Sequence, residues 1–146
     1  MFRKTQLTIY NKYEGVLQDY AQAAKWFRKA AEQGEAESQF LLARIYHDGT
    51  GLPQDNKQAA KWLTKAAEHG NAIAQAQLGS LYGKGEGVVQ DYARAHMWFN
   101  LAAANGRENG SEGRDLVAKE MTSDQIAEAQ KMAREMVEAN PKVMGD

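Results

Sequence analysis

The chain of 146 residues contains no cysteine. This excludes a disulfide framework and a metal site built on thiolates. Proline is also scarce, with two in the whole chain. No stretch approaches the ~18 consecutive apolar residues of a membrane span, and the first residues hold no apolar run long enough for a signal peptide. We therefore expect a protein outside the membrane and favour a cytoplasmic location.

Neither sign of charge is in excess. The chain carries 18 basic and 19 acidic residues, for a formal net charge of −1. A strongly basic surface is what attracts nucleic acids and anionic membranes, and the balance here supplies none. The composition therefore predicts neither a nucleic acid nor a membrane as the partner.

What the sequence does have is one unit repeated three times with a step of 36 residues and no insertion. The repeated positions are the pairs Gln18-Asp19, Gln54-Asp55 and Gln90-Asp91, together with Trp26, Trp62 and Trp98, Tyr10, Tyr46 and Tyr82, and Gly34, Gly70 and Gly106. A fixed period of this length is typical of a solenoid, whose units must stack because one unit cannot bury its apolar face alone.

Each unit reads as helix A, a glycine loop, helix B and a glycine stop. In the third copy the alanine-rich segment 72–82 favours helix A, with Ala74, Leu78, Leu81 and Tyr82 on one side. Gly79 lies beside this stripe and predicts a close helix crossing. The middle copy predicts an apolar face on helix B, formed by Ala59, Trp62, Leu63, Ala66 and Ala67. The fixed phase of the tryptophans favours packing over a ladder that stacks ligands.

The loop and the caps are predicted from small residues. Glycines at 85 and 87, and at 49 and 51, indicate backbone with positive φ, and the first copy keeps only Gly15. Asp19, Asp55 and Asp91 are predicted N-caps of helix B, and Gln22 and Gln58 follow the first two at the spacing of a capping box. Helix B should stop at Gly34, Gly70 and Gly106.

The segment after residue 106 departs from the unit. Ser111 is expected to cap a short helix to about Glu120, and Thr122 with Gln125 forms a capping-box pattern. An apolar stripe ends before Pro141 and consists of Ile126, Ala129, Ala133, Met136 and Val137. We predict a single repeat domain over 1–146, with repeats at about 1–34, 35–70 and 71–106, a C-terminal cap at 107–140 and a tail at 141–146.

Residues 72–106, AIAQAQLGSLYGKGEGVVQDYARAHMWFNLAAANG, resemble the unit of the Sel-one-like repeat (SLR) family, relatives of the tetratricopeptide repeats. The middle copy agrees well. The first is weaker, with Gln6 and Leu7 at the places of a leucine and a small residue. The resemblance implies an all-α fold, a right-handed α-solenoid of antiparallel helix pairs with a C-terminal capping helix segment. It also implies a non-enzymatic adaptor or scaffold for a protein or peptide, often in bacteria.

The candidate binding surface is the side of helix A turned away from the apolar stripe. Its positions differ between copies, while the positions that serve the stack repeat. We predict that the partner contacts Glu37, Phe40, Leu41, Arg44 and His47 in the middle copy and Ile73, Gln77 and Ser80 in the third. Asp48, Ala76, Gly83 and Lys84 lie on the same side. The alternative is that Phe40 packs against the neighbouring repeat.

The sequence predicts no catalytic residue, cofactor site or metal site. His47, His69 and His96 occupy three different phases of the unit, so they do not cluster as metal ligands do. The glycines at 83, 85 and 87 follow a helix rather than a strand and lack the Gly-Lys-Ser/Thr of a phosphate loop. No nucleophile has a neighbouring base in the sequence.

Two other functions compete with the scaffold. The first is self-association through the N-terminal repeat, where Phe2 and Leu7 lie in an uncapped helix A, or a role as a fragment of a longer repeat protein. The second is a hydrolase, because cysteine-rich relatives are linked to β-lactam compounds. The absence of cysteine makes the hydrolase the weakest of the three.

Overall fold

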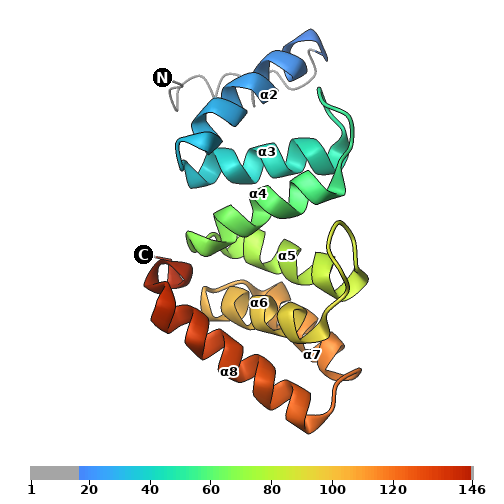
Figure 1. Cartoon of the computed structure of the whole chain (residues 1–146), viewed down its shortest axis with the longest axis vertical. Helices are drawn as coiled ribbons and strands as arrows, with labels where there is room; N and C mark the ends of the chain where they lie inside the picture. Colours follow the sequence, from blue (N-terminus) through green and yellow to red (C-terminus); the bar gives the residue numbers. More distant parts are fainter. Residues whose placement is uncertain (1–16, 146) are drawn as a thin grey trace. The chain divides into compact units, whose positions relative to one another are not determined.

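A computed structural model describes residues 17–145, with side chains from residue 20 onward. Within this range every regular element is a helix, as the sequence predicts (Figure 1). The elements are α2 (Leu17–Glu32), α3 (Ala36–Asp48), α4 (Asn56–Glu68), α5 (Ala72–Lys84), α6 (Tyr92–Ala104), α7 (Glu108–Ala118), α8 (Ser123–Ala139) and the 3-10 helix η1 (Pro141–Met144). The expectations for Phe2, Gln6, Leu7, Tyr10 and Gly15 lie outside the described residues.

The chain divides into two compact units, residues 1–62 and 63–146, with the boundary inside α4. In the first unit α2 packs against α3. The buried residues are the small or aromatic side chains of α2, chiefly Ala23, Ala24, Phe27, Ala30 and Ala31, and Leu42, Ala43 and Tyr46 of α3. The loop after α3 lies directly on α2, since a Cβ placed at Gly51 would be 2.6 Å from the carbonyl carbon of Tyr20. Only glycine fits there.

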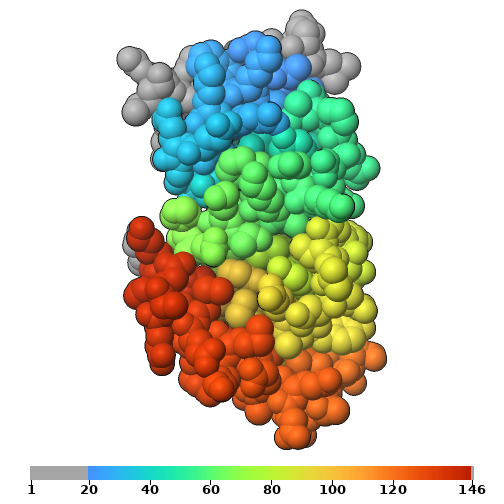
Figure 2. Space-filling model, viewed as in Figure 1, coloured from blue at the N-terminus to red at the C-terminus, as the bar shows by residue number. Residues whose placement is uncertain are grey.

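The second unit is built around α6, which packs against α5, α7 and α8. Figure 2 shows the C-terminal segment, in red, along one side of this unit. The ring of Phe99 lies between glycines of two helices: a Cβ at Gly79 of α5 would be 2.9 Å from the ring, and one at Gly113 of α7 would overlap it. The close crossing predicted from Gly79 is therefore confirmed, and its partner is the ring of Phe99.

The glycine loops and helix caps follow the prediction with two corrections. Gly49, Gly51, Gly85 and Gly87 all have positive φ. Asp55 accepts hydrogen bonds from the backbone N–H groups of Lys57 and Gln58, and Asp91 accepts one from Arg94. The backbone N–H of Asp55, however, donates to the carbonyl of Tyr46 at 2.8 Å. This N–H already has an acceptor, so it does not need the side chain of Gln58, which would accept from it in a capping box.

The second correction concerns Asp19. Helix α2 begins at Leu17, so Asp19 lies inside its first turn rather than at the N-cap. The physical reason is the residue two places earlier. The other copies have Pro53 and Val89 there, which are poor helix formers, whereas leucine is a good one.

Helix B ends in the same turn in all three copies. Gly34, Gly70 and Gly106 share a φ of 92°. In each copy the next residue donates its N–H to the carbonyl five places earlier, as from Asn71 to Ala66. This is the Schellman arrangement, which satisfies carbonyls at the helix end and requires a left-handed residue. The predicted glycine stop is confirmed.

The C-terminal region contains one confirmed cap and one correction. Thr122 and Gln125 form the predicted capping box at the start of α8. Ser111 does not cap a helix: α7 begins at Glu108, directly after the turn at Gly106 and 36 residues after the start of α5. It is thus a helix A in register with the repeat, followed by a shorter connection. Within the predicted tail, residues 141–144 form η1, in which Val143 is completely buried.

Candidate partner-binding surface

The predicted residues of the middle copy lie along one side of α3. Glu37, Arg44 and His47 are exposed, while Phe40 and Leu41 are half-buried. The opposite side is buried and carries Leu42, Ala43 and Tyr46. Because positions three, four and seven apart share a helix face, the five residues form a continuous strip with apolar groups between charged ones.

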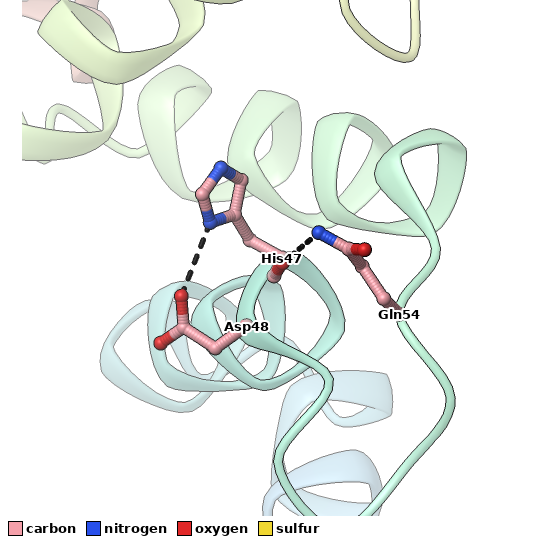
Figure 3. Close-up of polar contacts among 3 residues, drawn as sticks. All are labelled: His47, Asp48 and Gln54. Atoms are coloured by element: carbon pink, nitrogen blue, oxygen red, sulfur yellow. Dashed lines mark hydrogen bonds and ion pairs between the residues drawn. The ribbon is translucent and has the colours of Figure 1, made fainter.

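His47 ends this strip and takes part in a local polar contact (Figure 3). Its Nδ1 lies 3.1 Å from a carboxylate oxygen of Asp48. Its backbone carbonyl accepts a hydrogen bond of 2.8 Å from Nε2 of Gln54. The third copy repeats this bond, from Gln90 to the carbonyl of Gly83 at 2.9 Å. The repeated glutamine therefore ties the loop to the end of helix A, while the aspartate after it caps helix B.

The predicted residues of the third copy lie on α5. Ile73 is 40% exposed, Gln77 is exposed and Ser80 is half-buried. Ala76 is buried, contrary to its placement on the free side, because α5 packs against both α6 and α7. Phe40 occupies the place of Ala76 in the middle copy, and it is only partly buried.

Sequence reasoning missed a buried polar cluster. Gln75 has no exposed surface, and its Nε2 donates to the carbonyls of Ala67 at 3.0 Å and Val143 at 2.7 Å. Its Oε1 accepts from Nδ2 of Asn105 at 2.8 Å. Gln39, at the same place in the middle copy, is also buried and donates to Ala31. The available signal was a glutamine at the same place in two copies, each directly after a small residue, Ser38 or Ala74, that is fully buried.

Two of the three tryptophans pack in the interior as predicted. Trp62 and Trp98 are buried. Trp26 is half-buried and lies beside a surface hollow of about 370 Å³ on α2, where the ammonium of Lys29 is 5.6 Å from its ring. The packing predicted from the fixed phase of the tryptophans is therefore seen fully for Trp62 and Trp98 and only partly for Trp26.

Among residues 17–145 no three His, Asp or Glu side chains gather closely enough to hold a metal ion. His47 and His69 are exposed, whereas His96 of α6 is buried and its Nδ1 has no hydrogen-bond partner. Burial lowers the pKa of His96, the charge of Arg114 lowers it further, and Asp115 opposes them. The folded protein therefore holds this ring neutral at a pH where the unfolded chain would protonate it.

We expect the free energy of unfolding to fall as the pH drops below about 6.5, because the unfolded state then binds a proton that folded His96 does not. The slope contributed by one such group is at most about 1.4 kcal/mol per pH unit. Urea unfolding between pH 7.5 and 5.5 would measure it. His96→Gln should remove the slope, and the matched change His69→Gln at an exposed ring should leave it. Equal slopes in both variants and the wild type would assign the effect elsewhere.

No helix of the described residues is both long enough and apolar enough to cross a membrane. A family model described as the Sel1 repeat matches residues 10–35, 36–71 and 72–106. The chain belongs to the Sel1 repeat family. Sel1 repeat proteins generally act as scaffolds for protein interactions and typically bind proteins, and their fold is generally non-enzymatic. No curated protein matches the chain.

Two solved bacterial structures resemble this Sel1 repeat protein. One is c5321, a protective antigen of uropathogenic Escherichia coli with an SLR fold, at 37% identity and a TM-score of 0.85 over 94% of this chain. The other is a Sel1 repeat protein from Oxalobacter formigenes, at 36% identity and a TM-score of 0.71 over 77% of this chain. The chain spans 30% and 46% of their lengths. The all-α, SLR-type solenoid fold class is confirmed.

Proposed function

We propose that this Sel1 repeat protein is a non-enzymatic scaffold that binds a peptide or protein segment on its helix-A surface. The residues are Glu37, Phe40, Leu41, Arg44 and His47 of α3, and Ile73, Gln77 and Ser80 of α5. One contrast carries the proposal. In the second and third copies the repeated positions serve packing, caps and turns, whereas these positions differ between copies and most of them keep exposed surface. The scaffold acts as a single repeat domain over 1–146.

The chemistry of the α3 strip favours a particular kind of partner. Phe40 and Leu41 offer apolar surface at its centre, and Arg44 is exposed and makes no ion pair with the described residues. Aromatic residues and arginines dominate the energy of protein interfaces when they surround a desolvated centre. The partner segment should therefore bring an apolar side chain next to a carboxylate or to free backbone carbonyls.

An affinity capture from native lysate tests this surface. The wild type and the double variant Phe40→Ala with Arg44→Ala would be compared, with bound proteins identified by mass spectrometry. Loss of two central contacts should lower the affinity for the partner by tenfold or more, since each contact is expected to contribute at least about 1 kcal/mol. Circular dichroism would verify that the variant is folded.

A matched control replaces an exposed apolar residue and a nearby cation away from the proposed surface. Val89 is 88% exposed and Arg94 is exposed, and neither stands at a helix-A position, so Val89→Ala with Arg94→Ala removes similar groups from the loop before α6 and from α6 itself. The control should retain the partner. Equal loss in both variants, or capture unchanged by either, would place the binding site elsewhere. The self-association alternative depends on residues outside the described range.

A further inference from the structure

The end of the chain folds back onto the second unit as a short turn, residues 140–145, which we call the docked turn. Nδ2 of Asn140 donates to the carbonyl of Glu68 at 2.7 Å. The side chain of Val143 is fully buried, and its carbonyl accepts hydrogen bonds from Gln75 at 2.7 Å and Asn105 at 2.9 Å. A Cβ at Gly70 would be 2.5 Å from the backbone of Gly145. The docked turn thus covers the end of α4 and the start of α5.

The groups that receive the docked turn are part of the repeat. One unit earlier, Glu32, Gly34 and Gln39 stand at the places of Glu68, Gly70 and Gln75. Gly34 and Gly70 have the same φ of 92°, and both end their helix with the same hydrogen-bonded turn. Gln39 donates to the carbonyl of Ala31 at 3.2 Å, as Gln75 does to Ala67 at 3.0 Å. The first unit therefore repeats three of the groups that contact the turn, while the place of Asn105, which also donates to the carbonyl of Val143, is taken by His69.

The two places differ in what covers them. A Cβ at Gly34 would meet no described atom within 4 Å, whereas one at Gly70 would overlap the docked turn. Gln39 is 3% exposed; among residues 17–145 its Oε1 has no hydrogen-bond partner, and its Nε2 makes one of the two bonds that Nε2 of Gln75 makes. Because a side-chain amide has two N–H groups, the second one of Gln39 can donate to a carbonyl of a ligand, as that of Gln75 does to Val143.

We propose that Glu32, Gly34 and Gln39 form a peptide-binding site for a partner segment with the chemistry of the docked turn. Such a segment carries a side-chain amide that donates to the carbonyl of Glu32, a branched aliphatic residue whose carbonyl accepts from Gln39, and a glycine that lies against Gly34. In this chain that pattern reads Asn-Pro-x-Val-x-Gly. The site uses different groups from the helix-A surface, so each proposal can fail without the other.

The test is binding of a fluorescently labelled peptide, EANPKVMG, to the full chain, measured by anisotropy. Saturable binding to the wild type is expected. Gly34→Ala should weaken it at least tenfold, because the added methyl group would occupy the place where the peptide backbone lies. Gly106→Ala is the matched control, because Gly106 has the same φ of 92° and a Cβ there also meets nothing within 4 Å. It carries the same backbone strain and should leave the affinity unchanged.

Three outcomes would overturn the proposal. The first is no binding at millimolar peptide. The second is binding that survives Gly34→Ala but is lost in Gly70→Ala, which would mean that the peptide only exchanges with the docked turn. The third is self-association of the wild type that Gly34→Ala abolishes in sedimentation equilibrium, which would make a second copy the occupant. On the ligand side, replacing the valine of the peptide with aspartate should reduce binding at least tenfold.

Discussion

Gln75→Leu should lower the free energy of unfolding by about 2–3 kcal/mol, whereas Gln39→Leu should stay within about 1 kcal/mol of the wild type. The two glutamines occupy the same place in successive repeats and are both buried. Within the part of the chain that the structure describes, Gln75 makes three hydrogen bonds, two donated and one accepted, while Gln39 makes one and leaves its Oε1 unpaired. Leucine has a similar volume, so the difference between the variants isolates the polar contacts from the packing.

Urea unfolding followed by circular dichroism would measure both changes. Gln75→Leu should also release residues 140–145, because the amide of Gln75 holds the carbonyl of Val143, and faster hydrogen exchange there would report it. Gln39→Leu should not alter exchange in that segment. If the two substitutions cost the same, the network around Gln75 would contribute nothing beyond what the repeat already provides.

Gly110→Ala should destabilise the protein by about 2–3 kcal/mol, although alanine is the better helix former. Gly110 lies in the first turn of α7, and a Cβ there would be 2.6 Å from the backbone nitrogen of Ala103 and 2.7 Å from the carbonyl oxygen of Phe99. Backbone atoms cannot rotate away as a side chain can. Helix α7 would therefore have to move off α6, and the packing of Val117 against Phe99 would loosen.

Gly83→Ala is the control for this prediction. Gly83 is also helical, but its added Cβ would meet only Val117 at 3.6 Å and Ala95 at 3.9 Å, which are ordinary contacts. Alanine should therefore be neutral or stabilise by up to about 1 kcal/mol. Thermal unfolding of the two variants would show shifts of opposite sign. A stabilised Gly110→Ala would mean that α7 does not need its close approach to α6.

The repeat allowed much of the fold to be predicted from the sequence. Asp55, Asp91 and Thr122 have caps that depend on a few neighbouring residues, so their spacing sufficed. Gly79 signalled a close approach, because a glycine inside a helix is costly unless packing requires it. These features are local, or they recur in several copies, and both properties make them visible in a single sequence.

The missed features depend on contacts between distant parts of the chain. Val143 lies in a segment that looks like a polar tail, yet it is buried through Gln75 and Asn105, which are 68 and 38 residues away. The start of α7 was obscured because Ser111 offered a plausible cap and Arg107 offers none. On the candidate surface, Ala76 was misplaced because α5 packs against α7 as well as against α6.

The shared turn at Gly34, Gly70 and Gly106 has a consequence for how such a chain can change in length. Each copy ends in the same backbone conformation, and the helices that follow these glycines, α3, α5 and α7, start 36 residues apart. Duplication or loss of one whole copy would therefore recreate a turn between copies that the fold already contains, and no further substitution would be needed at that turn. Within the described residues, the departure from the repeated unit is confined to the segment after Gly106, so the number of copies before it can change while α7 and α8 are kept.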